Sequence, residues 1–400
     1  MDFTDETGLE STILCKESFV CMDEALLIAK SFMEWNQGVS TKVLPENTRS
    51  LRSTSVIKSE NKYRNGKIVC DTLMYVFNFD KGFTIVSATK DAHQILAYSD
   101  IDSFDENDTE NIGQNIWLEY IKNTIEKVID NPSEKENMMD AYNTIKFTEN
   151  IIDHIQTRGW VFFDEIRFYE EVGPLLTTAW HQDWPYDTFT PIVNGSHVPV
   201  GCVPIAVSQV VNYRQKLSGE SINWGAISLK DTSEITNLMQ ILFYGIGMST
   251  VMDIHGDAQS HPSLCFPDFF CYRSRITNYL NSKGYYTNWV DLGNQTPITL
   301  PAIYEGFESC FLGLTDWFGG HWWVLDGYRK YEKWYGWAEE ANMSPAPPTK
   351  GGEHEPPLMV WGYLFLHFNF GWKSTSSNTW YGVSGSYLDF CKNFKRLDLF

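Results

Sequence analysis

The chain is 400 residues long, and because single domains usually have about 100–200 residues we expect two or three domains. Its 51 Asp and Glu against 31 Lys and Arg give a formal net charge of −20, which argues against a nucleic-acid-binding protein or one that docks on an anionic membrane, since both need clustered basic side chains. The sequence has no apolar run of about 18 residues, the length that indicates a transmembrane helix. With 43% hydrophobic residues, including 15 Trp, 20 Tyr and 25 Phe, the composition is typical of a folded protein with a large core.

The sequence carries no clear targeting signal, disulfide pattern or metal-binding motif. Residues 1–6 lack the basic and apolar regions of a signal peptide, so we expect either a cytosolic chain or one whose signal has been removed. The 8 cysteines are too sparse for a disulfide scaffold, and none stands in a CxxC pair that would indicate a zinc or redox site. The 9 histidines are scattered without an HExxH motif, so we expect no metal and no cofactor.

The first half combines helical and strand signals. A helix is predicted over residues 22–35, where small and aromatic side chains recur at helical spacing. Two apolar runs, residues 73–79 and 83–88, flank an Asp-Lys-Gly turn, which predicts a β-hairpin with Gly82 in the left-handed conformation. Residues 95–98 are predicted to form a third strand.

A second helical stretch and a change of composition indicate where the first domain ends. Residues 112–155 are helical in character, with a break at Pro132. We place the boundary between about residues 155 and 173, after which Gly, Trp and Pro are more frequent. Further on, we expect a turn at Tyr328 and then a long surface insertion, marked by the Pro and Gly residues of 345–357.

The most informative segment surrounds Cys202. Gly201 allows a sharp turn just before the cysteine, and Pro204 suits the first turn of a helix, where its missing N–H costs no hydrogen bond. The apolar residues that follow predict a buried helix, so Cys202 is expected at a helix N-terminus, whose partial positive charge favours the thiolate. The pattern indicates a nucleophile, with a buried structural cysteine as the alternative that the local sequence leaves open.

Three further polar residues stand in informative places. His321 opens a buried strand that an Asp-Gly turn at residues 326–327 is expected to close. Asn369 is the polar residue of an aromatic strand and can orient an imidazole ring. Gln182 lies upstream of the cysteine, where its amide can stabilise an oxyanion. The structural alternatives are a satisfied core histidine, a core asparagine and a surface glutamine.

The order Gln182, Cys202, His321 and Asn369 is the papain-like arrangement. In that chemistry the thiolate attacks a carbonyl carbon, the histidine relays the proton to the leaving group, and the asparagine holds the ring. The glutamine and the backbone N–H of the cysteine stabilise the tetrahedral oxyanion. The order therefore favours thiol-based catalysis at a carbonyl group.

Around these residues the chain resembles the streptopain family of papain-like cysteine peptidases. The similar segments of the second half are residues 173–187, 201–213, 301–306 and 320–327, and Asn369-Phe370-Gly371-Trp372. In the first half, residues 75–79, 82–88 and 95–100 are similar to the inhibitory propeptide of the family. Together the similar segments touch most of the chain in the order of the family.

The resemblance implies an α+β fold with two domains. An α+β propeptide domain, residues 1–160, would precede a papain-like catalytic domain, residues 161–400, in which a helical part carries the nucleophile and an antiparallel sheet or barrel forms the other part. It also implies a bacterial endopeptidase, secreted or on the cell surface, that is made as a zymogen. Its expected partners are protein or peptide substrates and its own propeptide, which would cover the cleft.

By position, the resemblance assigns the catalytic roles. Cys202 is the expected nucleophile, His321 the general base and acid, Gln182 the oxyanion donor and Asn369 the residue that orients the histidine. The residues expected to line or support the cleft are Gly201, Gly320, Trp322, Phe370 and Trp372.

The sequence departs from the family pattern at the site. Phe370 stands where the family has Trp, Pro204 and Ile205 replace small residues, and residues 253–258 match the substrate loop of the family only loosely. These departures motivate one alternative, a catalytically weak or inactive homologue that acts as a binding or inhibitory protein. The other alternative is a transglutaminase-like acyl transferase, which shares the Cys–His order.

Overall fold

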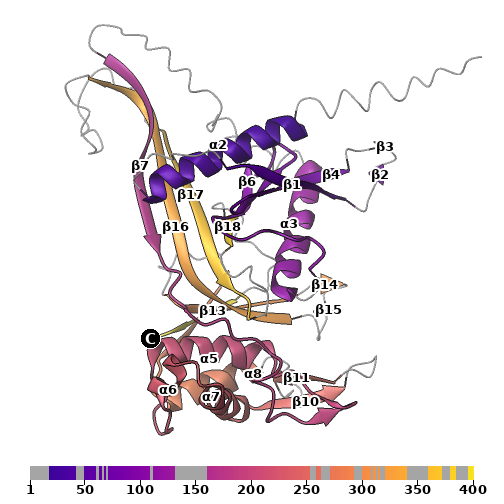
Figure 1. Ribbon diagram of the computed structural model, residues 1–400, viewed down its shortest axis with the longest axis vertical. Helices are drawn as coiled ribbons and strands as arrows, with labels where there is room; N and C mark the ends of the chain where they lie inside the picture. Colours follow the sequence, from indigo (N-terminus) through magenta and orange to yellow (C-terminus); the bar gives the residue numbers. More distant parts are fainter. Residues whose placement is uncertain are drawn as a thin grey trace, which may run out of the picture.

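The computed structural model describes residues 18–41, 49–59, 63–64, 67–68, 71–108, 111–130, 160–252, 258–262, 271–291, 300–307, 310–311, 314–315, 320–339, 359–371, 379–383 and 395–400. Figure 1 shows a sheet-rich body that carries two long helices, with a layer of further helices at one end of the sheet. Among the described helices, none combines the length and the apolarity that a membrane span needs.

A single antiparallel sheet runs through both halves of the chain. In the described residues it has 11 strands in the order β1-β4-β5-β6-β18-β17-β16-β13-β19-β12, and β7 also pairs with β16. The strands are β1 (Leu51–Lys58), β4 (Thr72–Phe79), β5 (Phe83–Ser87), β6 (Ile95–Ser99), β7 (Trp160–Val172), β12 (Thr287–Asp291), β13 (Ala302–Phe307), β16 (Gly320–Glu339), β17 (Met359–Asn369), β18 (Trp380–Val383) and β19 (Lys395–Leu399). The two halves join where Tyr98 of β6 pairs with Trp380 of β18.

Two helices cover opposite faces of the N-terminal strands. Helix α2 (Met22–Thr41) packs against Tyr75 and Phe77 of β4, and helix α3 (Ile112–Asp130) packs against Met74 and Val76 of the same strand. Because successive side chains of a strand point to opposite faces, this strand is buried on both sides. The predicted helix, hairpin and third strand are confirmed.

The hairpin between β4 and β5 shows why a glycine is needed at its turn. Gly82 has a φ of +87°, in the left-handed region that L side chains rarely adopt. A Cβ atom there would lie 2.2 Å from the carbonyl oxygen of Ser99. The predicted conformation of Gly82 is therefore confirmed.

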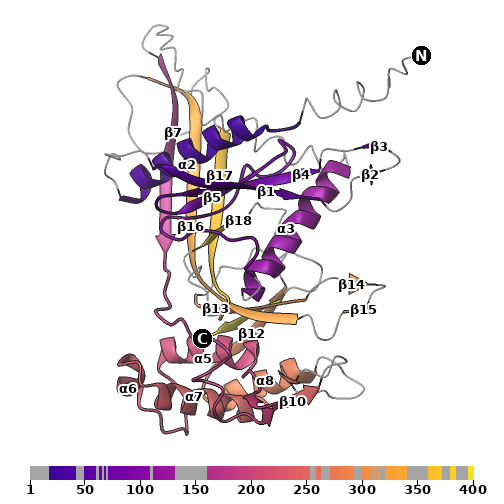
Figure 2. The ribbon, with the colours of Figure 1, turned by 45° about the vertical axis from the view of Figure 1, so that its right-hand side comes forward.

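The second half places its helices at one end of the sheet. These helices are α5 (Cys202–Arg214), α6 (Trp224–Ser228), α7 (Thr232–Gly245) and α8 (Cys271–Ser282), and both views show them together below the strands (Figures 1 and 2). Short strand pairs lie outside the main sheet: β2 (Tyr63–Arg64) with β3 (Lys67–Ile68), β8 (Ile192–Val193) with β9 (Ser196–His197), β10 (Met248–Met252) with β11 (Ala258–Pro262), and β14 (Cys310–Phe311) with β15 (Leu314–Thr315).

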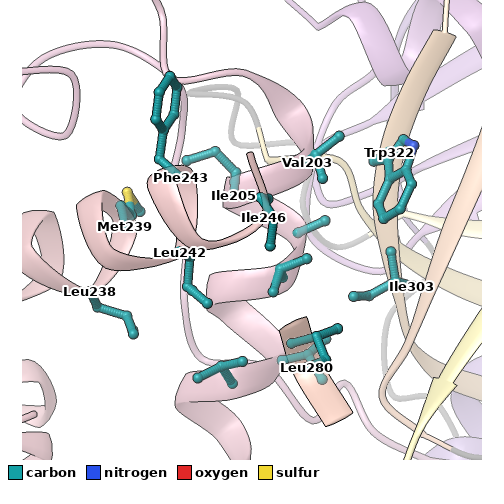
Figure 3. Packing of buried hydrophobic residues seen from close by; sticks show 14 of the residues in the cluster. Val203, Ile205, Leu238, Met239, Leu242, Phe243, Ile246, Leu280, Ile303 and Trp322 are labelled. Carbon is teal, nitrogen blue, oxygen red and sulfur yellow. The ribbon is translucent and has the colours of Figure 1, made fainter. Parts of the chain in front are cut away.

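Helix α5 is the central element of this layer. Every residue from Val203 to Val211 is buried, which agrees with a helix that is apolar on all sides. Figure 3 shows Val203 and Leu242 of α7 in one cluster with the strand residues Ile303 and Trp322. The buried helix predicted after Cys202 is therefore confirmed, and it packs directly on the sheet.

Strand β16 is longer than predicted. The expected turn at residues 326–327 is wrong, because the strand continues to Glu339 with a shift of register against β17 at this point. The carboxylate of Asp326 accepts the backbone N–H of Leu176 at 3.1 Å and lies 2.5 Å from Nδ1 of His367. These partners hold Asp326 within the sheet, and pairing with β7 carries the strand past the predicted turn.

The described residues leave some predictions unexamined. The insertion at 345–357, Trp372, the helical stretch beyond Asp130 and most of the segment 253–258 lie outside them. The proposed boundary region is described in its second part, where residues 160–172 form β7 and pair with β16.

Candidate active site

Cys202 is the first residue of helix α5. Gly201 caps this helix with a φ of 92°, and a Cβ atom there would lie 2.7 Å from the carbonyl oxygen of Ser260. Both the backbone conformation and the lack of space require a glycine. The predicted sharp turn before the cysteine is therefore confirmed, and it places the thiol at the N-terminus of a buried helix.

The environment of the Cys202 thiol keeps it protonated. Cys202 is half-buried, and desolvation, with a smaller contribution from the charge of Glu305, raises the pKa of the thiol to about 11. Backbone hydrogen bonds from Trp322, Cys202 and Val203 favour the thiolate and lower the pKa. The helix N-terminus thus acts in the predicted direction, but desolvation is the larger effect.

His321 lies on β16, opposite Gly306 of β13. Its side chain is 3% exposed, and burial lowers the pKa of the imidazole to about 4, against the opposing effect of the Phe370 carbonyl. The Nε2 atom lies 3.0 Å from that carbonyl oxygen, which can only accept, so the neutral ring carries its proton on Nε2. The Nδ1 atom is then the basic nitrogen, as a proton acceptor for a thiol requires.

Asn369 connects the sheet to helix α5. Its Nδ2 donates to the carbonyl oxygen of Thr178 at 2.9 Å and to Oε1 of Gln209 at 3.0 Å. Its Oδ1 accepts from Nε2 of Gln209 at 3.3 Å and from the backbone N–H of Gly371 at 3.1 Å. These bonds fix the backbone on both sides of Phe370, whose carbonyl oxygen contacts His321.

Gln209 is a site residue whose role sequence reasoning missed. It lies seven residues after Cys202 on α5, so the two side chains are on the same side of the helix, about two turns apart. Its Oε1 also accepts the hydroxyl of Thr178 at 2.8 Å. A long polar residue at this spacing within the apolar run of the helix is the signal that could have found it.

Gln182 lies beside the loop that precedes Cys202. The residue is 7% exposed, and its carbonyl oxygen accepts the backbone N–H of Val200, directly before Gly201, at 2.9 Å. This hydrogen bond holds the backbone around Gln182 next to the turn at Gly201, which precedes Cys202. The surface-loop alternative is therefore wrong, while the role of the amide as oxyanion donor stays a prediction.

The predicted supporting residues lie on both faces of the sheet. Trp322 packs with Val203 on the α5 side (Figure 3), and Gly320 begins β16. Phe370 packs on the opposite side, where a Cβ atom on Gly113 of α3 would lie 2.1 Å from Cγ of its ring. The first turn of α3 therefore rests directly on Phe370, next to the His321 contact.

Sequence reasoning also missed a buried acid near Cys202. Glu305 of β13 is 1% exposed and forms an ion pair with Arg273 at 2.7 Å. The signal in the sequence is a single carboxylate within an apolar strand. No group of three His, Cys, Asp or Glu side chains suited to a metal ion occurs in the part of the chain that the structure describes.

Comparison with known proteins gives the family of this arrangement. Residues 180–381 match the model of the Peptidase C10 family and include Gln182, Cys202, His321 and Asn369. The chain belongs to this family. It is a bacterial cysteine-type endopeptidase, and the match of residues 17–125 to the Spi protease inhibitor model shows that its N-terminal part is a propeptide of the inhibitor type.

Relatives and solved structures agree with this assignment. Streptopain from Streptococcus pyogenes is 21% identical over 325 residues, which cover 69% of this chain and 73% of the relative. Streptopain from Streptococcus pyogenes serotype M1 is 25% identical over 174 residues, 40% of this chain and 37% of the relative. A prointerpain A fragment from Prevotella intermedia has the same fold, with a TM-score of 0.50, 15% identity, and coverage of 86% of this peptidase and 98% of that chain.

Proposed function

We propose that the peptidase is a secreted or cell-surface zymogen that hydrolyses peptide bonds through Cys202 and His321. The observation that carries the proposal is that Cys202 begins the buried helix α5, with its sulfur hydrogen-bonded to the backbone of Trp322, the residue after His321. A latent precursor protects the producing cell until the protein has been exported, which supports the proposed location. We place the end of the propeptide near residue 160.

The arrangement supports a two-step acyl transfer to water. Nδ1 of His321 accepts the thiol proton, the Cys202 sulfur bonds to the carbonyl carbon, and the amine leaves with the proton from the imidazolium. Water then attacks the thioester and the free thiol is regenerated. The Gln182 amide and the Cys202 N–H are proposed to donate to the oxyanion in both steps.

Asn369 is proposed to orient His321 through the backbone. Its bonds to Gln209, Thr178 and Gly371 fix the chain on either side of Phe370. The Phe370 carbonyl oxygen in turn holds Nε2 of His321 at 3.0 Å. This contact selects the tautomer that leaves Nδ1 basic.

Contacts of the propeptide support latency. The first turn of α3 rests on Phe370, and Trp117 of α3 packs on Tyr381 of β18 with ring centroids 4.8 Å apart. This cover contributes to the burial of His321, whose Nε2 contacts the Phe370 carbonyl oxygen. Removal of the propeptide would hydrate the imidazole, raise the pKa of His321 and so favour its protonated form, as the thiolate–imidazolium pair requires.

Incubation of the purified full-length chain with a reducing agent tests the proposal. We expect a cut between about residues 155 and 173 and subsequent hydrolysis of casein, both blocked by iodoacetamide and both lost in a His321→Ala variant. The same cut in His321→Ala would contradict the catalytic role of His321. Stable binding of casein without hydrolysis would favour the inactive homologue, and transfer of the acyl group to an added amine in place of water would favour the acyl transferase.

A further inference from the structure

Glu305 is a buried acid whose position the proposed chemistry does not explain. Ile303, two residues earlier on β13, packs among the residues of α5, whereas Tyr304 packs on the opposite face of the sheet. Because side chains alternate along a strand, Glu305 points to the same side as Ile303, toward the start of α5. A carboxylate is costly to bury unless it is paired, so its retention at 1% exposure calls for an explanation.

The carboxylate of Glu305 has donors on two neighbouring elements. The Tyr272 hydroxyl donates to Oε1, and Nε of Arg273 donates to Oε2 at 2.7 Å. Both donors lie in the first turn of α8, where the helix dipole also favours a negative charge. Burial raises the pKa of Glu305, whereas the charge of Arg273 and the hydrogen bonds from Tyr272, Arg273 and the Trp322 side chain lower it.

Aromatic packing fixes these donors in place. The Trp322 ring contacts those of Trp289 and Tyr272, with centroids 5.8 Å and 6.4 Å away. The Arg273 guanidinium lies 5.6 Å from the centroid of the Trp289 ring. Glu305 therefore has a fixed position, and its ion pair with Arg273 opposes the effect of burial on its charge.

The fixed anion acts on the nucleophile. Glu305 is opposite Trp322 in the strand register, and Trp322 contributes the backbone hydrogen bond to the Cys202 sulfur. The charge of Glu305 is one of the causes that raise the pKa of the thiol. The other titratable groups that contact Glu305 are Tyr272 and Arg273 on α8, and His321 directly precedes Trp322 on β16.

We propose that Glu305 is a positioning residue for the nucleophile, an anion that holds Trp322 against α5 and places a negative charge near the Cys202 thiol. The inference rests on the proposed function in that it takes Cys202 as the nucleophile. A negative charge near a thiol disfavours the thiolate. Glu305 is therefore expected to raise the pH at which peptidase activity begins to rise. Its hydrogen bond with the Trp322 side chain keeps the backbone N–H of Trp322 next to the Cys202 sulfur.

The test measures the pH dependence of Cys202 alkylation by iodoacetamide in full-length chains, with peptide mapping by mass spectrometry. All chains carry His321→Ala, which stops self-processing and removes the titration of the imidazole. The alkylation midpoint is the pH at which the alkylation rate of Cys202 reaches half of its maximum. In Glu305→Gln, which keeps the shape of the side chain and loses its charge, this midpoint is expected to fall by about one pH unit. Glu305→Asp keeps the charge and is expected to stay near the parent midpoint.

The matched control is Glu220→Gln. Glu220 pairs with Lys283, directly after α8, and its removal is expected to leave the midpoint unchanged. An unchanged midpoint in Glu305→Gln would overturn the proposal. The same fall in Glu305→Asp would also overturn it, because the shorter acid keeps the charge and a fall in both variants would indicate a purely structural role for Glu305. Where thermal denaturation shows that Glu305→Gln does not fold, the double variant with Arg273→Gln leaves no unpaired buried charge and is expected to lower the midpoint too.

The measured alkylation midpoints do not depend on whether the protein hydrolyses peptides. No chain in the experiment has His321, so a failure of the proposed peptidase activity would leave the alkylation midpoints as they are. An unchanged midpoint in the variant would refute the role of Glu305 alone.

Discussion

Replacing Cys202 with alanine is expected to lower kcat for peptide hydrolysis by at least about 10⁴-fold. The reason is that alanine has no atom that can form the acyl intermediate. Alanine suits the first position of α5 and keeps the Cβ atom, so the fold should be retained. The measurement compares kcat on a fluorogenic peptide after both chains have been cut in the link by an added serine peptidase, with circular dichroism to confirm folding.

The matched control for this variant is Cys21→Ala. Cys21 is an exposed free cysteine directly before α2, in the propeptide. Its replacement should leave kcat unchanged. Hydrolysis by folded Cys202→Ala at the parent rate would contradict the assignment of the nucleophile.

The second large effect is expected at Arg329 of β16, which joins the propeptide to the peptidase. Its Nη1 donates to the Tyr98 hydroxyl at 2.8 Å and to Asp100 at 2.7 Å, both in or next to β6. Its Nη2 donates to Glu171 of β7 at 3.1 Å, and its guanidinium lies 4.1 Å from the ring centroid of Trp380. The side chain is 9% exposed and the two carboxylates 28%, so the site is mostly shielded from water.

Arg329→Met is therefore expected to weaken propeptide docking by about 2–3 kcal/mol, less than for a fully buried pair. In a Cys202→Ala background, which stays uncut, amide hydrogen exchange in β6 should become about 30- to 100-fold faster, since 1.4 kcal/mol corresponds to tenfold. The control is Lys58→Gln, which removes an exposed ion pair with Asp71 within the propeptide. Unchanged exchange in β6 of Arg329→Met would contradict the role of Arg329.

The elements that the sequence predicts well are those with local signals. Gly82 and Gly201 both have a positive φ and have close neighbours that leave no room for a side chain. Each stands at a turn that the surrounding sequence pattern predicts. The buried helix after Cys202 has nine successive buried residues, which local hydrophobicity alone predicts. The order of the four candidate catalytic residues was likewise readable from the chain.

Features that depend on distant partners could not be predicted in this way. The Asp-Gly pair at 326–327 is typical of a turn, but Asp326 is held by Leu176 and His367, which are 150 and 41 residues away in the chain. The amide pair of Gln209 and Asn369 joins residues 160 positions apart. Their spatial pairing follows from packing of α5 on the sheet.

The protonation state of the site also required the structure. The helix N-terminus predicts a stabilised thiolate, and the backbone hydrogen bonds do act in that direction. Burial opposes them and keeps the Cys202 thiol neutral, with a pKa of about 11. The extent of burial depends on the sheet and the helices that pack around Cys202, and a local motif does not encode these contacts.

The central claim is that Cys202 is the nucleophile of a peptidase released from its propeptide. Titration of the processed enzyme with an epoxysuccinyl peptide inhibitor, followed by mass mapping, tests it most directly. We predict that activity falls in proportion to the adduct and disappears when one equivalent is bound, with the adduct on Cys202. Full activity after complete modification of Cys202, or loss of activity with the adduct on another residue, would contradict the account.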